Sequence, residues 1–148
     1  MKKPYPLLCI LFLIYWSCED TKEEESTIIF SKTFGGSGWD QLSFIQQTTD
    51  DGYIIIGTTE SFGNGNDDIW LIKTDSRGNE DWCPTFGGSE DDRGYSVQQT
   101  TDGCYVIVGT TKSYGNGGFD TWLIKIDSKG NKLWDQTFGD ELYEIGKS

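Results

Sequence analysis

The chain repeats a unit of 52 residues. Thr33-Phe34-Gly35-Gly36 returns as Thr85-Phe86-Gly87-Gly88, and it returns again as Thr137-Phe138-Gly139-Asp140, each time 52 positions later. A repeat of this length is typical of a supersecondary unit that buries its apolar face only by stacking on its neighbours. The sequence therefore favours an array of similar units over a single unrepeated core.

Each unit contains four short runs with the composition of β-strands, separated by turn residues such as Asp50-Asp51-Gly52. No window of ten residues has the helical period. We therefore predict an all-β fold of antiparallel four-stranded units over 37–88 and 89–140, with partial flanking strands at 27–34 and in a third copy that runs to residue 148. The strands are expected at 43–48, 53–59, 69–74 and 80–86, and again at 95–100, 105–111, 121–126 and 132–138.

Four strands in about 50 residues are typical of a β-propeller blade. Segments such as Gln98–Asp102 and Trp122–Lys125 closely resemble a repeat of secreted proteins and lipoproteins in bacteria and archaea, similar to quinoprotein-like and SBBP-type propeller repeats. The resemblance covers 27–148. It implies a non-catalytic binding or scaffold module that needs no cofactor.

Residues 75–82 also look similar to the tryptophan-docking segment of quinoprotein propellers, although the turn from Asp75 to Gly78 is one residue short. The resemblance implies that Trp82 and its counterpart Trp134 leave the outer strand and pack against the neighbouring unit. Two further tryptophans recur at equivalent positions and are also expected to serve packing, namely Trp70 and Trp122.

The number of units raises a question of closure, because propellers need about four or more blades. Two complete units would leave apolar sheet faces in water. Three explanations remain open at this point. The chain is a piece of a longer repeat protein, it completes a ring by self-association through its open blade faces, or it persists as a two-sheet sandwich.

The N-terminus predicts export. Lys2 and Lys3 precede an apolar stretch at 7–16, which is far shorter than the roughly 20 residues that span a bilayer. Residues 1–17 are therefore expected to form a signal peptide. The following Cys18 resembles the acylated cysteine of bacterial lipoproteins, although Tyr15 stands where that family prefers leucine. An ordinary cleaved signal is the alternative.

Residues 18–26 are rich in glutamate and aspartate and predict a solvated tether after the lipidated cysteine. The stretch resembles the surface-export signal of Bacteroidota lipoproteins. The expected location is the bacterial cell envelope, with the lipid anchor in the outer membrane and the protein at the cell surface. The net charge of −12 argues against nucleic acid as a partner, whereas a protein or a glycan remains possible.

The chain contains no histidine, which excludes histidine-based nucleophile systems and histidine metal ligands. Cys83 and Cys104 fall in different units and are expected to be independent thiols, with a disulfide between them as the alternative. Neither has a basic neighbour in the sequence that would activate a thiolate. We therefore expect no enzymatic activity.

Two weak candidates for ligand binding remain. A calcium site would take oxygens from one loop, whereas the alternative is that Asp68 and its counterpart Asp120 accept hydrogen bonds from the loop backbone. Trp39 has no aromatic counterpart, and it either stacks on a sugar or partner in a lectin-like site or covers an open blade face. The calcium candidates are Asn64, Asn66, Asp67 and Asp68.

Overall fold

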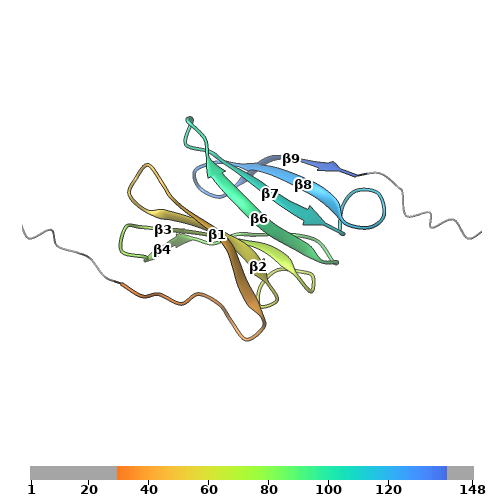
Figure 1. Ribbon diagram of the computed structural model, residues 1–148, viewed down its shortest axis with the longest axis horizontal. Coiled ribbons are helices and arrows are strands. Elements are labelled where there is room, and N and C mark those ends of the chain that lie inside the picture. The colour runs from red at the N-terminus through yellow and green to blue at the C-terminus, as the bar shows by residue number, and fades with distance from the viewer. Residues whose placement is uncertain (1–29, 140–148) are drawn as a thin grey trace, which may run out of the picture.

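The computed structural model describes residues 30–139. The predicted signal peptide, Cys18, the acidic tether and residues 140–148 lie outside the described residues. Within them, nine strands form two antiparallel sheets (Figure 1). The strands are β1 (Asp40–Gln47), β2 (Tyr53–Thr59), β3 (Asp68–Thr74), β4 (Glu80–Trp82), β5 (Thr85–Phe86), β6 (Asp92–Gln99), β7 (Tyr105–Thr111), β8 (Asp120–Ile126) and β9 (Lys132–Phe138).

The strands of each sheet pair in sequence order. The first sheet runs β1-β2-β3-β4, with β5 also paired to β3, and the second runs β6-β7-β8-β9. The predicted all-β fold of antiparallel, propeller-blade-like units is therefore confirmed. Strands β1 and β6 begin three residues earlier than predicted. In both, the register shifts within the strand, between Leu42 and Phe44 and between Gly94 and Ser96, so the sequence alternation that marks a strand is broken there.

Two predicted strands differ from the structure. The strand expected at 80–86 is divided into β4 and β5 at Pro84, which has no N–H to donate and whose carbonyl instead accepts a bond of 3.1 Å from the Leu71 N–H. The flanking strand expected at 27–34 is not formed over its described part. Phe30–Phe34, which we call the strap, runs without strand pairing.

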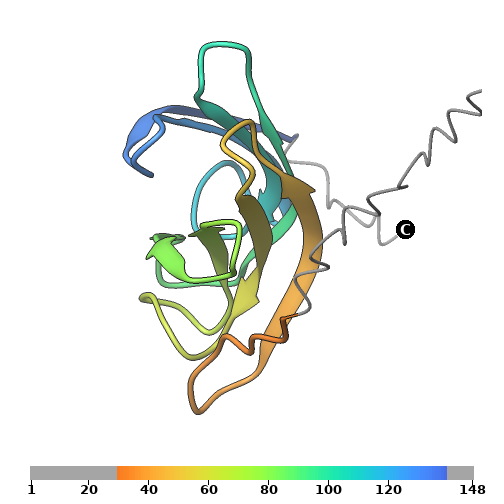
Figure 2. The same ribbon diagram turned by 90° about the vertical axis from the view of Figure 1, so that its left-hand side faces the viewer.

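The main core lies between the two sheets. In Figures 1 and 2 the second sheet lies across one face of the first, with β6 beside β1 and β2. Side chains from both sheets are excluded from water there, and burial of this apolar area drives the packing. The cluster consists of Ile54, Ile56, Ile69, Leu71, Val97, Tyr105, Ile107, Trp122, Ile124 and Ile126, with Trp82 and Phe86 packed against it.

A smaller core covers the other face of the first sheet. Ile55, Trp70 and Ile72 are buried there, and Phe34 of the strap and Tyr53 pack against them. The strap therefore shields an apolar face that would otherwise be in water.

The four recurring tryptophans do not share one environment. Trp70 and Trp122 are buried. Trp82 packs on the second unit, where its ring meets the edge of Tyr105 at a centroid distance of 5.9 Å. Trp134 is 44% exposed, so the prediction that it packs against a neighbouring unit is wrong for the described chain, because residues 30–139 provide no further sheet beside it.

Candidate functional site

The loop before β3 is organised around a buried carboxylate. Asp68 is 1% exposed, and its Oδ2 accepts hydrogen bonds of 2.9 Å from the backbone N–H groups of Asn64 and Gly65. The second unit repeats the arrangement, with Asp120 accepting a bond of 2.7 Å from the Asn116 N–H. The geometry is the one expected when the aspartate satisfies loop backbone donors.

A second candidate calcium ligand, Asp67, is also engaged within the protein. Asp67 makes an ion pair of 2.9 Å with Arg93 in the second unit. Within residues 30–139, no group of three or more acidic, cysteine or histidine side chains is arranged to hold a metal ion. The carboxylates of Asp67 and Asp68 are therefore engaged by contacts within the protein.

Another pair of aspartates, neither of them a predicted site residue, ties the Gly-Gly marker to the first strand of each unit. Asp40 accepts hydrogen bonds from the Thr59 and Ser61 hydroxyls and from the Gly36 N–H. Its counterpart Asp92 accepts bonds of 2.6 Å from Ser113 and 2.8 Å from the Gly88 N–H. The signal was available, because each of these aspartates and serines recurs after 52 residues.

The local environment of Asp40 affects its ionisation in two opposing ways. Burial by itself raises its pKa, but the hydrogen bonds from Thr59, Gly36 and Ser61 prevail and hold the pKa of Asp40 below its usual value. The carboxylate is thus stabilised in its charged form as a structural acceptor. It has no property of a general acid at neutral pH.

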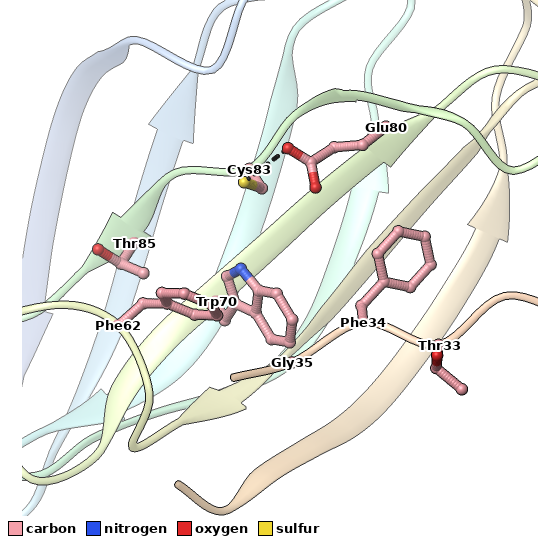
Figure 3. Close-up of a pocket in the computed structure, with 8 residues that line it drawn as sticks. All are labelled: Thr33, Phe34, Gly35, Phe62, Trp70, Glu80, Cys83 and Thr85. Atoms are coloured by element: carbon pink, nitrogen blue, oxygen red, sulfur yellow. Dashed lines mark hydrogen bonds between the residues drawn. The ribbon is translucent and has the colours of Figure 1, made fainter. Parts of the chain in front are cut away.

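One hollow of about 330 Å³ opens beside the strap (Figure 3). Phe34, Phe62 and Trp70 form its apolar part, and Glu80 and Cys83 lie on the opposite side, where the thiol donates a hydrogen bond of 3.0 Å to Glu80 Oε1. Burial, together with the neighbouring carboxylate, raises the pKa of Cys83 to about 11. The thiol is therefore protonated at neutral pH and a poor nucleophile.

The two described cysteines are independent of each other. Cys83 and Cys104 are both free thiols. Burial, with the Asp102 carboxylate adding to it, also raises the pKa of Cys104. Neither thiol has the depressed pKa that marks a reactive cysteine.

A second hollow, which we call the junction hollow, lies where the two units meet and has a volume of about 470 Å³. Two aromatic side chains belong to its lining, and both are open to solvent: Trp39 is 83% exposed and Tyr95 is 50% exposed. The remaining lining is polar and combines an ion pair with amide, hydroxyl and carboxylate groups. It consists of Gln41, Ser43, Thr58, Glu60, Asp67 and Arg93.

Trp39 is held by its backbone and leaves its side chain free. Its carbonyl accepts a bond of 2.8 Å from the Glu60 N–H, and its own N–H donates to Glu60 Oε2 at 3.4 Å. At 83% exposure the indole covers no blade face, so that alternative is wrong. The exposed indole remains available to a ligand.

The facing wall of the junction hollow comes from β6. Arg93 is fixed by its ion pair with Asp67, and this hydrogen bond raises the pKa of the guanidinium. The Tyr95 hydroxyl lies 3.1 Å from the Thr110 hydroxyl, which orients the ring. Tyr95 was missed by sequence reasoning because it stands inside a predicted strand. Its counterpart is Ser43, so an aromatic residue present in only one unit was the available signal.

Two aromatic faces beside convergent polar groups can bind a small polar ligand whose rings have an apolar side. Sugar rings have this character, and so do aromatic side chains of a partner protein.

Among residues 30–139 there is no helix long and apolar enough to cross a membrane. Neither the protein-family models nor the curated proteins compared with the sequence give a match.

Proposed function

We propose that the protein is a lipid-anchored, extracytoplasmic module of β-propeller-type repeats that binds a ligand without transforming it. The observation that carries the binding role is the junction hollow, where an exposed tryptophan and an exposed tyrosine stand beside polar groups on two packed sheets. A rigid pair of sheets is a suitable support for such a site, because little conformational freedom is lost when the ligand binds.

The lipid anchor rests on the sequence. A short apolar stretch at 7–16, followed by Cys18 and then by acidic residues, predicts an acylated N-terminus, which would hold the folded units outside the cytoplasm. The bacterial cell envelope, with the anchor in the outer membrane, is the proposed location. The acidic composition disfavours nucleic acid, so the proposed ligand is a protein or a glycan.

Replacing Cys18 with alanine tests the anchor. In a bacterial host the unchanged chain should incorporate labelled palmitate and partition into detergent, because two or more acyl chains hold a protein stably at a membrane. The Cys18→Ala chain should lose both properties. Cys83→Ala is the matched control, since it removes a cysteine outside the proposed signal and should leave label and partitioning unchanged. Equal labelling of the Cys18→Ala chain would contradict the proposal.

A lectin-like function is the second candidate, and the junction hollow favours it. Trp39 offers an open indole face to a sugar ring, and Glu60 and Gln41 offer acceptors and donors for its hydroxyls. Arg93 is already paired with Asp67, so a neutral sugar suits the site better than a charged one.

A glycan array followed by titration calorimetry tests this candidate. For any glycan that binds, Trp39→Ala should weaken the affinity by about tenfold or more, because a central aromatic contact usually contributes about 2 kcal/mol. Trp134→Ala removes a different exposed tryptophan outside the hollow and should leave the affinity unchanged. Absence of glycan binding, or equal losses in the two variants, would contradict the lectin-like function while leaving a protein ligand open.

A further inference from the structure

The two sheets pack head to tail, through different faces of the same repeat. The first sheet presents Ile54 and Ile56 to the interface, whereas the second presents Tyr105 and Ile107. In the repeat, Ile54 and Ile56 correspond to Val106 and Val108, and Val108 is 38% exposed. The face that is covered in the first sheet is therefore open in the second.

One aromatic position marks this interface. Trp82 packs against Tyr105, and a Cβ placed on Gly130 would lie only 3.2 Å from the Trp82 ring. The indole thus lies against both a tyrosine and a turn glycine of the following unit. Gly130 has φ of +85°, so the glycine serves the turn and the close approach together.

The strap reproduces these contacts 52 residues earlier. Phe30 meets the edge of Tyr53 at a centroid distance of 6.2 Å, and a Cβ placed on Gly78 would lie 2.6 Å from the Phe30 ring. Phe30, Tyr53 and Gly78 are the repeat counterparts of Trp82, Tyr105 and Gly130. The strap thus occupies the place that the outer strand of a preceding unit would occupy.

The third member of the series is Trp134, and it lies on the open face of the second sheet with Phe138, which is 54% exposed. The charges on this face are already paired. Lys125 contacts Asp102 at 3.0 Å, as its counterpart Lys73 contacts Asp50 at 2.9 Å beneath the second sheet. Covering the open face would therefore leave no unpaired lysine there.

We propose that the open face of the second sheet docks the first sheet of another copy of this chain. Trp134 of one copy takes the place of Phe30 in the next, against Tyr53 and Gly78, and the strap of that copy is displaced. A second copy is the occupant because its first sheet is the repeat counterpart of the second sheet. Within the chain, the second sheet already packs on the corresponding face of the first. The larger indole buries more apolar area than the phenyl ring it replaces. The contact is heterologous, and it lies apart from the junction hollow.

The test uses disulfides between distinguishable full chains in which Cys9, Cys18, Cys83 and Cys104 are serine. Within the chain the Gln99 N–H donates to Gln46 Oε1 at 3.2 Å, so docked copies should place Gln98 of one beside Gln47 of the next. A mixture of Gln47→Cys and Gln98→Cys chains should give the mixed disulfide in clear excess over both symmetric ones. Thr121→Cys, exposed on the open face at the other end of the sheet, is the register control and should not cross-link to Gln47→Cys.

Two added substitutions give the same proposal a second readout. Trp134→Ala in the Gln98→Cys chain should lower the yield of mixed disulfide several-fold, and Phe30→Ala in the Gln47→Cys chain should raise it, because the strap then competes less. Symmetric disulfides in statistical proportion, no cross-link, or a mixed disulfide insensitive to Trp134→Ala would each overturn the proposal.

Discussion

Trp82→Ala is expected to lower the free energy of unfolding by about 3 kcal/mol. This is the lower end of the range for replacing a buried large aromatic side chain with alanine. The loss is large because the indole is part of the contact between the two sheets. It packs on the main core and meets Tyr105, so its removal leaves a cavity at the only junction between the two described units. Urea unfolding followed by tryptophan fluorescence and circular dichroism measures the change.

Trp134→Ala is the matched comparison, because Trp134 holds the same position in the repeat but is 44% exposed. Its loss should cost less than about 1 kcal/mol when measured at a protein concentration too low for copies to dock. The comparison therefore shows whether the loss in free energy of unfolding comes from packing against a following unit or from the tryptophan itself. Equal costs for the two substitutions would contradict the assignment of Trp82 to the interface.

The second large effect is expected from Gly57→Ala. A Cβ at Gly57 would lie 2.0 Å from the Gln41 carbonyl oxygen on β1, which is far inside van der Waals contact. Both groups belong to the backbone of paired strands, so relief requires β1 and β2 to separate beside the register shift at Leu42. We expect a loss of about 3 kcal/mol or more in the free energy of unfolding, and failure to fold in a chain of ordinary marginal stability.

Gly118→Ala provides the control for Gly57→Ala. No atom lies within 4 Å of a Cβ placed there, and Gly118 is not among the glycines with positive φ. The change should be neutral or slightly stabilising, because alanine restricts the unfolded chain. If Gly57→Ala unfolded at the same urea concentration as Gly118→Ala, the close approach of β1 and β2 would be contradicted.

Sequence patterns located the strands well where turn residues stand at both ends of the strand. Strands β2, β7 and β9 begin and end at the predicted residues. The starts of β1 and β6 were missed because Asp40 and Asp92 read as loop residues. In the fold they are strand residues whose carboxylates accept hydrogen bonds from serine hydroxyls some 21 positions away. A local sequence pattern does not show such a long-range contact.

The candidate site could be predicted only in part. Trp39 is conspicuous because it interrupts the repeat, and its exposure leaves it open to a ligand. The hollow itself requires Tyr95 and Arg93 of one unit to meet Thr58 and Glu60 of the other, and a pattern within one unit carries no information on that approach. The burial of Trp134 was wrongly predicted for the same reason, since burial at that position depends on a neighbouring sheet rather than on the residues of its own unit.

The pairing of strands in sequence order has a consequence for how the chain folds. Strands β2 and β7 are nearly identical in sequence, as are much of β3 and β8, so exchanged pairings would be almost as stable as the correct ones. Each correct hairpin closes over a loop of eight residues, whereas an exchanged one must close a loop of dozens of residues. Loop closure is faster for short loops. The kinetics of hairpin formation, rather than differences in final energy, should therefore keep the two units from mixing their strands.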